Sequence, residues 1–456
     1  MKNDLIVRLE ESHMQPSRLL WSAYLAYHLR GQAKFPFKPL AVIQRAQGRR
    51  VRSMIAHAYR TVPYYRETMT RLGLGLDDFR TIDDLTKLPV IEREQLQRDP
   101  EYFVSTSQPL ARYLELQSGG SSGMPCTVYH DATAIFQNAA HAERERAMIT
   151  ALVGRSYGYR ETVFASSPGT DQRVQGFAQR RGFFPAGMQI HRQYLSLLDA
   201  PEKNVSLLNI FQPDVIHGFG SYLEILFSYL HTTCQPFHRP KAITYSSDGM
   251  SNTTRRFIKE TLGVPIVSTY EAIEAFKIGF ECLHGRGLHL NIDLYPVRIV
   301  DTQGKPLPDG ESGDVVVSNL VNRATVLLNY RLGDLSFLLA ESCPCGRSLP
   351  LLAFPQGRSD DWIRLPSGQI MHPQPVVDIL EDRETIWQFQ IVQESDGHFR
   401  VSIVASPTCD REAIAKRVRS DFQQKLGDDV TVDFAFVDHI ERTAGGKLRP
   451  LISKKS

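Results

Sequence analysis

The sequence predicts an α/β fold with a large N-terminal domain, residues 1–357, that carries mixed and parallel sheets, followed by a small α+β domain, residues 358–456. Short apolar strands alternate with helical segments between about residues 114 and 270, which is typical of a largely parallel sheet. Denser, hairpin-like strands follow up to about residue 340. A polar turn at 357–361 then precedes alternating strand patterns and one helical segment, and we place the domain boundary near this turn.

The composition is that of a globular protein. Hydrophobic residues make up 42% and charged residues 23% of the chain, which excludes a disordered or membrane-embedded protein. The net charge of +3 gives no reason to expect a nucleic-acid partner. The charged N-terminus lacks the apolar run of a signal peptide, and no segment reaches the roughly 18 apolar residues of a membrane span. Together with six sparse cysteines, these features predict a cytoplasmic location.

The N-terminal part is predicted to be mainly helical. The apolar and aromatic segment 19–29 predicts a helix docked on the body, with a membrane-surface or partner-docking helix as the alternative. A longer helix is expected from about residue 41, because apolar residues recur there at helical spacing until Pro63 ends the run. After a strand at 114–117, a loop and a second strand, Asp131 is predicted to cap a helix that reaches about Val153.

The alternating region and the segments after it supply most of the predicted strands. Apolar strands are expected at 162–166, 214–219, 242–247 and 265–270, with helices at 221–231 and 253–263 between them. The later strands are expected at 288–293, 295–301 and 313–318. In the small domain, strands at 389–394, 399–405 and 430–437 surround a helix at 413–426.

The loop Ser118–Pro125 contains three glycines and three serines. Glycines let the backbone turn tightly, so such a loop between two strands can wrap phosphate groups with its amides, while a flexible surface turn is the alternative. The same residues contain Gly-x-Ser-x-Gly, the pattern of a serine hydrolase. That motif needs a helix directly after the loop, whereas strand-like residues follow here, which disfavours the hydrolase.

Three further segments carry charged residues suited to nucleotide chemistry. Glu274 follows the strand 265–270, and open α/β sheets place ligand chemistry at this end of their strands. Its carboxylate can hold Mg²⁺, while Asp334 in a turn can accept hydrogen bonds from both ribose hydroxyls. Lys447 is flanked by glycines, which suggests a mobile loop that delivers one cation to a distant site. The alternatives without a function are a solvent-exposed carboxylate for Glu274, an ordinary turn residue for Asp334 and a basic C-terminal tail for Lys447.

The order and spacing of these segments resemble the adenylate-forming superfamily, and within it the phenylacetate–CoA ligase-like branch. The resemblance extends from about residue 45 to 450. It is carried by the segments HAYRTVPYYRETM, TIDDLTKLPVIER, HGFGSYLEIL, FECLHGRGLHLNID, CPCGR, GRSDDWIRLPSGQIMHP and RTAGGKLRP.

The resemblance implies an AMP-forming ligase that uses ATP and Mg²⁺ to activate a carboxylic acid as its acyl-AMP, with release of pyrophosphate. The acyl group would then pass to a thiol such as CoA, after the small mobile domain swings about a hinge at Asp360. Lys447 and Glu274 would be catalytic, with Glu274 also holding Mg²⁺. The implied ATP-binding residues are Ser118, Gly119, Gly120, Ser121, Ser122, Gly123, Ser247, Asp248, Tyr270, Asp334 and Arg358.

Three positions depart from the pattern of this family. Met124 stands where the loop commonly has lysine, Ile273 precedes the catalytic Glu274 in place of Thr or Arg, and Glu271 takes a position that is usually Gly. The alternatives are therefore transfer to an amine or a carrier-protein thiol, or a non-catalytic relative that binds nucleotide or acyl groups.

Candidate residues for the pocket of the substrate acid suggest an apolar or aromatic acid, although the same residues are equally typical of a hydrophobic core. They are Phe164, Phe183, Phe184, His217, Phe219 and Tyr222.

Cys282, His289, Cys343 and Cys345 form a candidate zinc site. Three thiolates and one imidazole suit tetrahedral Zn²⁺, and some members of the resembled branch carry a similar set. With all four positions filled by protein, the metal would be structural. His284 is a competing ligand, and reduced cysteines or a disulfide are the alternatives.

Overall fold

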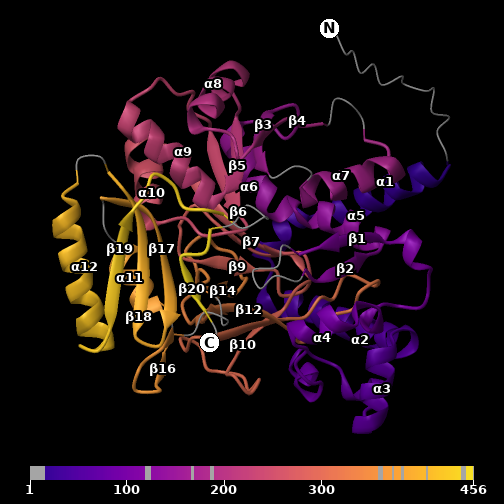
Figure 1. Ribbon diagram of the computed structural model, residues 1–456. Helices are drawn as coiled ribbons and strands as arrows, with labels where there is room; N and C mark the ends of the chain where they lie inside the picture. The colour runs from indigo at the N-terminus through magenta and orange to yellow at the C-terminus, as the bar shows by residue number, and fades with distance from the viewer. Residues whose placement is uncertain are drawn as a thin grey trace.

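The protein, described here from a computed structural model, consists of a large unit with a mixed central sheet and a small unit with its own sheet (Figure 1). The structure describes residues 16–118, 125–165, 169–184, 189–357, 363–371, 374–381, 385–406, 409–442 and 448–454. No helix in these ranges is long and apolar enough to cross a membrane. The predicted α/β class is thus confirmed, whereas the boundary near residue 360 stays a prediction because 358–362 lie outside the described ranges.

Helices dominate the first part of the large unit: α1 (Pro16–Leu29), α2 (Leu40–Thr61), α3 (Pro63–Leu72), α4 (Arg93–Arg98), α5 (Ala132–His141) and α6 (Glu143–Val153). Short 3-10 helices, such as η1 (Gln32–Phe37), connect some of them. Asp131 caps α5 as predicted, but the single helix expected up to Val153 is broken at Ala142. The break adjoins Arg144, whose side chain leaves the helix surface to pair with Asp293 in the interior.

The two N-terminal helices are held by apolar packing. Helix α1 lies against α5, where the Trp21 and Phe136 rings stack with centroids 4.9 Å apart, so the docked helix predicted from the sequence is confirmed. Helix α2 buries one face, as its spacing predicts, and Pro63 begins the next helix. The buried residues of that face include Val51, Met54, Ile55 and Ala58.

The central sheet has the order β13-β14-β9-β8-β7-β6-β5-β3-β4 in the described residues. Its parallel part consists of β3 (Arg160–Ala165), β4 (His191–Ser196), β5 (Val215–Phe219), β6 (Ala242–Ser246) and β7 (Ile266–Ala272). The antiparallel part consists of β8 (Phe276–Glu281), β9 (Leu288–Leu290), β13 (Leu338–Leu339) and β14 (Leu351–Leu352). Helices α7 (Thr170–Arg181), α8 (Pro201–Phe211), α9 (Gly220–Thr233) and α10 (Asn252–Arg256) connect the parallel strands, with a π-helical turn at Phe257–Thr261.

The order of the parallel strands places a ligand crevice. Strand β3 pairs with both β4 and β5, so the chain runs outward to β4 and then returns to the other side of β3. In open α/β sheets, ligands bind outside the carboxyl ends of the strands at such a switch point. The carboxyl ends of β3, β5, β6 and β7 are therefore where we look for the site.

Two smaller sheets complete the large unit. The hairpin β1 (Leu114–Gln117) and β2 (Thr127–His130) flanks the glycine-rich loop. An antiparallel sheet is formed by β10 (Val297–Val300), β11 (Gly313–Val317) and β12 (Tyr330–Ser336).

The small unit has a four-stranded sheet of order β19-β18-β17-β20, made of β17 (Ile386–Ser395), β18 (His398–Ala405), β19 (Thr431–Phe436) and β20 (Leu451–Ser453). The short pair β15 (Ile363–Arg364) and β16 (Ile370–Met371) precedes it, and helices α11 (Gln374–Glu381) and α12 (Arg411–Leu426) pack on it. Val418 and Phe422 of α12 belong to an apolar core drawn entirely from this unit. It meets the large unit where β17 lies against α9.

Candidate active site

Glu274 lies in the turn between β7 and β8, with its carboxylate largely buried. The hydroxyl of Tyr330 on β12 donates to Glu274 Oε1 at 3.4 Å, and the Glu274 backbone carbonyl accepts from the Asn319 amide at 2.8 Å. Burial and the charge of Glu274 raise the pKa of Tyr330 well above its ordinary value, so the phenol stays a donor. The turn is thus fixed, while Glu274 keeps acceptor capacity for a cation.

Tyr270 and Asp334, two of the predicted nucleotide residues, meet in space. Tyr270 is near the end of β7 and Asp334 is on β12, and the Tyr270 hydroxyl donates to Asp334 Oδ2 at 2.6 Å. Strands far apart in the sequence therefore bring these side chains to one side of the Glu274 turn. Whether they bind a nucleotide stays a prediction.

The predicted phosphate loop is a hairpin loop, because Gln117 of β1 pairs with Thr127 of β2. Ser118 at its start accepts hydrogen bonds from the Cys126 backbone amide at 3.0 Å and from the Arg93 guanidinium at 3.1 Å. The structure places a strand after the loop where a nucleophile elbow needs a helix, which supports the sequence argument against a hydrolase. Residues Gly119, Gly120, Ser121, Ser122, Gly123 and Met124 lie outside the described ranges.

Arg93 is a candidate site residue that the sequence analysis missed. It is the first residue of α4. Burial raises the pKa of Cys126 and of Tyr330, and the nearby charge of Arg93 lowers both pKa values by a smaller amount. Its Nε is buried and has no hydrogen-bond partner among the described residues. The segment that contains Arg93 was noted only for its family resemblance, and no spacing rule connects it to Ser118.

The carboxyl end of β6 faces the start of α9. Ser247 is exposed with φ of 75°, and Asp248 accepts hydrogen bonds from the Ser221 amide at 3.1 Å and from the Ser221 hydroxyl. A side chain at Gly220 would place its Cβ 2.3 Å from the Gly249 carbonyl oxygen, so only glycine permits this approach. Burial raises the pKa of Asp248, while its hydrogen bonds with Ser221 lower it.

The small unit forms hydrogen bonds with this corner, which is made of Ser221 at the start of α9 and Asp248 after β6. Leu448 donates its amide to Asp248 at 3.2 Å, Gln388 of β17 donates to the Ser221 carbonyl at 2.8 Å, and Arg442 donates to the Ser221 hydroxyl. Residues 443–447, which include Lys447, lie outside the described ranges, as do Arg358 and Asp360. Arg442 and Leu448 nevertheless flank the Lys447 segment and fix both of its ends at the carboxyl edge of β5 and β6.

The aromatic residues suggested for an acyl pocket are divided in the structure. Phe164 and Tyr222 pack together in the core beside the sheet, with ring centroids 4.8 Å apart, and Phe183 is exposed. His217, on β5, pairs through Nδ1 with the Thr244 hydroxyl at 2.9 Å. Most of this set therefore does not form a common cavity.

Glu271, the departure next to Tyr270, has an ionic partner. Its carboxylate lies 2.6 Å from the Lys277 ammonium, which also lies 3.1 Å from Glu145. Burial raises the pKa of Glu271, but the charge and the hydrogen bond of Lys277, with a smaller contribution from His217, together outweigh burial and lower the pKa. The position usually held by Gly is thus filled here by an ionised side chain.

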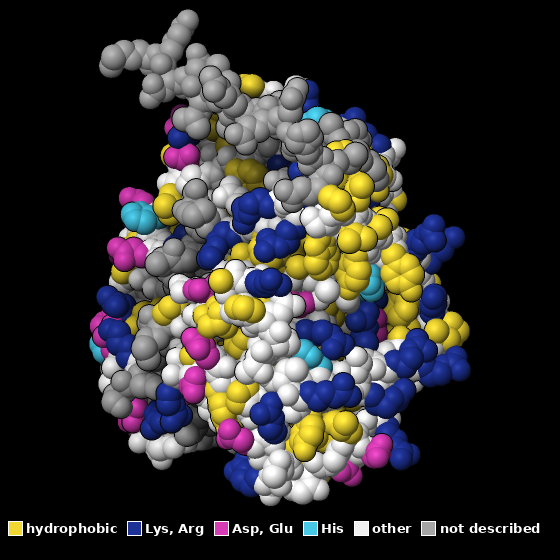
Figure 2. Space-filling model, turned by 90° about the vertical axis from the view of Figure 1, so that its right-hand side faces the viewer, with side chains coloured by type: hydrophobic (Ala, Val, Ile, Leu, Met, Phe, Trp, Pro, Cys, Tyr) yellow, Lys and Arg dark blue, Asp and Glu magenta, His cyan; other side chains and the backbone are white. Residues whose placement is uncertain are grey.

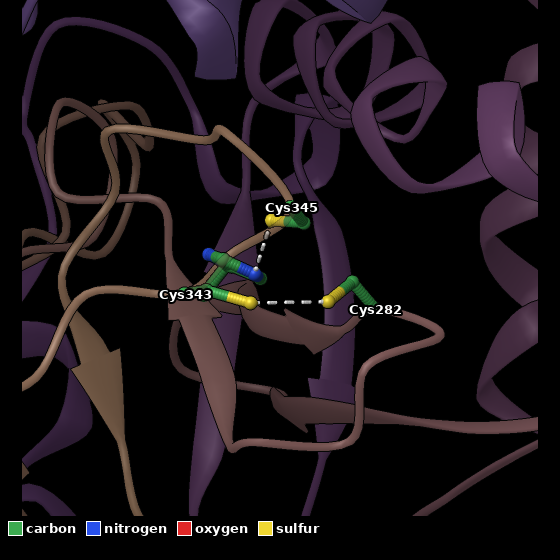
Figure 3. A group of neighbouring side chains, drawn as sticks. Cys282, Cys343 and Cys345 are labelled. Atoms are coloured by element: carbon green, nitrogen blue, oxygen red, sulfur yellow. Dashed lines mark hydrogen bonds between the residues drawn. The ribbon is translucent and has the colours of Figure 1, made fainter.

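The four candidate zinc ligands converge (Figure 3). Cys282 follows β8, His289 is on β9, and Cys343 and Cys345 come from the loop between β13 and β14. The Cys282 and Cys343 sulfurs are 3.5 Å apart, Cys345 Sγ is 3.3 Å from His289 Nε2, and all four donor atoms lie within 4.8 Å of one another.

These distances fit a tetrahedral metal site. Zinc–sulfur bonds of about 2.3 Å place neighbouring sulfurs about 3.7 Å apart, close to the observed spacing. A disulfide would need sulfurs about 2.05 Å apart, and all six cysteines are free thiols here. His289 belongs to the group and His284 does not.

Residues 364–454 match the family model of the CapK C-terminal domain. A phenylacetate-coenzyme A ligase of Thermus thermophilus is 26% identical over 415 residues, which covers 87% of this chain and 86% of that protein. Among solved structures, 2-hydroxyisobutyryl-CoA ligase in the postadenylation state with R3-HIB-AMP gives a TM-score of 0.71 at 18% identity, covering 93% and 92% of the two chains.

The same ligase in its thioesterification state, with 2-HIB-AMP and CoA, gives a TM-score of 0.56 at 17% identity over 93% and 91% of the chains. The chain is a relative of the phenylacetate-coenzyme A ligases with the fold of the adenylate-forming enzymes, as the sequence segments predict.

Proposed function

We propose that this chain is an adenylate-forming acid–thiol ligase. It joins a carboxylic acid to the α-phosphate of ATP, with release of pyrophosphate, and then passes the acyl group to a thiol such as CoA. The observation that carries the proposal is the convergence of Glu274, the Tyr270–Asp334 pair, Ser118 and the flanks of the Lys447 segment at one edge of the sheet.

The residues divide the work of the first half-reaction. The loop 118–123, with Ser118 at its start, would hold the phosphates, and Asp334 with Tyr270 would hold the ribose side of ATP together with Arg358. Ser247 and Asp248 would border the adenine. The donor set at Glu274 suits Mg²⁺, which would neutralise phosphate charge when bound.

No general base is needed for this step. A carboxylic acid has a reference pKa of about 4 and is ionised at neutral pH, so it attacks the α-phosphorus directly. The negative charge that develops on the phosphate oxygens is matched by Lys447. Arg442 and Leu448, which bond to Ser221 and Asp248, would position the Lys447 segment for this contact.

We further propose that Arg93 supplies the phosphate contact that Met124 cannot. The guanidinium already donates to Ser118 at the start of the loop, and its buried Nε has no hydrogen-bond partner in the described part of the chain. Guanidinium groups bind phosphate oxygens with strong, charge-assisted hydrogen bonds. This argues against the non-catalytic relative, which the loss of the loop lysine would favour.

The second half-reaction requires the small unit to leave its present position. The contacts at Ser221 and Asp248 hold it in the arrangement suited to adenylation, and a swing about Asp360 would break them and withdraw Lys447. A carrier-protein thiol or an amine remains an alternative acceptor. The four-ligand zinc site would be structural, tying the loop 343–345 to β8 and β9.

ATP–pyrophosphate exchange with a panel of aryl, fatty and amino acids tests the proposal. Wild-type protein should show exchange that depends on one acid class, and Lys447→Ala should lower it by about 10²–10³. Lys425→Ala, an exposed lysine of α12 in the same unit, is the matched control and should behave as wild type. ATP binding without exchange for any acid would favour the non-catalytic relative, and absence of ATP binding would overturn the proposal.

A further inference from the structure

A polar cavity of about 320 Å³ lies between α2, η1, α5 and the start of α6. Its walls contain four arginines, Arg49, Arg50, Arg144 and Arg323. None of its lining residues is a candidate for nucleotide or metal binding. The volume falls at the lower end of the roughly 300–1,000 Å³ typical of small-molecule sites.

One of the four arginines is fully paired. The Arg144 guanidinium makes two hydrogen bonds to Asp293, at 2.7 and 2.9 Å, with side-chain exposures of 1% and 2% for the two residues. It also donates to Asn291 at 3.0 Å and lies over the Phe35 ring, 4.4 Å from its centroid. Asp293 is the one acidic residue that lines the cavity, and both of its oxygens are engaged by Arg144.

The other three arginines have no carboxylate partner among the described residues. Arg50 donates to the Gln137 side chain at 3.2 Å and Arg323 donates to Ser53 at 2.6 Å, which leaves most of their donors unused. Burial lowers the pKa of Arg50, and the positive charge of Arg144 lowers it further, although Asp293 acts in the opposite direction. Asp131 accepts from the Arg323 backbone amide at 3.1 Å, so two carboxylates, Asp293 and Asp131, face four arginines and the cavity carries a net positive charge.

The surface around α2 and α3 is also basic. Figure 2 looks onto the side of the molecule that carries these helices, and Lys and Arg side chains gather over the lower half of that face. A positive cavity in a basic surface concentrates anions and speeds their entry. Three guanidinium groups in one cavity, none of them in a salt bridge among the described residues, can donate to the several acceptor oxygens of a phosphate group.

We propose that this cavity is a binding site for a phosphate-bearing anion, held by Arg49, Arg50 and Arg323. Arg144, locked by Asp293, forms the fixed floor, and the amide of Gln137 and hydroxyl of Ser53 orient the other guanidinium groups. The residues that line it are not among those assigned to the proposed nucleotide site. The phosphate belongs either to a small soluble molecule or to a lipid headgroup, because both present the same oxygens to the arginines.

Inorganic phosphate titrated into the full-length protein by calorimetry is the direct test. Wild type should bind, and Arg50→Gln should weaken binding on the order of ten-fold or more, as expected for loss of a charged hydrogen-bond donor. Arg49→Gln is the second variant, because Arg49 is exposed at the rim and its replacement leaves the fold intact. Arg45→Gln is the control, since Arg45 is an exposed residue of α2 that does not line the cavity.

Vesicles distinguish the two sources of phosphate. If wild type floats with phosphatidylglycerol vesicles but not with phosphatidylcholine vesicles, and Arg49→Gln but not Arg45→Gln abolishes flotation, the ligand is a lipid headgroup. Phosphate binding without flotation identifies a soluble ligand. If wild type binds no phosphate, or if all variants bind it equally, the proposal is overturned, and pyrophosphate exchange measured in parallel remains informative about the proposed ligase.

Discussion

Replacing Arg93 with glutamine tests whether this chain has a substitute for the missing loop lysine. In the structure the Arg93 guanidinium donates to Ser118 at 3.1 Å and its buried Nε lacks a partner among the described residues. Hydrogen bonds to a charged group contribute about 1.5–3 kcal/mol, which corresponds to roughly 10–150-fold in binding. Arg93→Gln should therefore raise the apparent KM for ATP in pyrophosphate exchange by about that factor.

The substitution can be rescued if the reasoning is correct. Met124→Lys restores a cation to the loop, so the double variant Arg93→Gln/Met124→Lys should recover a large part of the lost ATP affinity. Arg98→Gln, at the exposed end of the same helix, is the control for nonspecific loss of charge. A KM for ATP within two-fold of wild type in a folded Arg93→Gln protein would refute the role assigned to this arginine.

Three further predictions concern the metal sites and the unit interface. Glu274→Gln should raise the Mg²⁺ concentration for half-maximal exchange, measured by titration at fixed ATP, and an unchanged requirement would remove Glu274 from the magnesium site. Native mass spectrometry should find one zinc ion in wild type and in Cys409→Ser but none in Cys343→Ser, which should also have a lower Tm; a zinc-free wild type would contradict the site. Burial raises the pKa of Glu224, on α9, from 4.5 to about 7, so the fold loses stability as pH rises from about 4.5 to 7 and the carboxyl ionises. Glu224→Gln removes this loss: its free energy of unfolding in urea, minus that of wild type, should be up to about 3 kcal/mol larger at pH 8 than at pH 4. The same difference at both pH values would exclude this effect.

Regular elements could be predicted because their signals are local. Helix α2 follows from apolar spacing, and strands β5, β6 and β7 follow from short apolar runs between helices. The break at Ala142 could not be predicted, because the apolar spacing continues through it. The ion pair of Arg144 with Asp293 could not be predicted either, because the two residues are 149 positions apart and the local sequence carries no signal of the contact.

The candidate site shows the same division. Glu274 was found because it follows a predicted strand, Tyr270 through the family resemblance, and the cysteines because of their residue type. Arg93 escaped notice because its neighbour Ser118 is 25 residues away and a single arginine in a short helix is ordinary. The hydrogen bond between Tyr270 and Asp334 joins β7 and β12, which belong to different sheets, so only the tertiary structure brings the two side chains together.

The unit interface is built to be reversible. Three of its direct hydrogen bonds join Ser221 and Asp248 to Gln388, Arg442 and Leu448. Neutral hydrogen bonds contribute about 0.5–1.5 kcal/mol each and charged ones somewhat more, so these three contacts together amount to a few kcal/mol. That is enough to favour one arrangement and small enough for bound ligands to shift the equilibrium.

Because all three contacts lie at the Gly220 corner, one rotation breaks them together. The Gly220–Gly249 approach allows no side chain, so a Gly220→Ala substitution should push α9 from the loop after β6 and weaken the whole set. A two-step reaction that needs two positions of the small unit would then lose the adenylation position first. Pyrophosphate exchange should fall in Gly220→Ala more than transfer from supplied acyl-AMP to CoA, and equal losses in both half-reactions would show that this corner does not hold the adenylation arrangement.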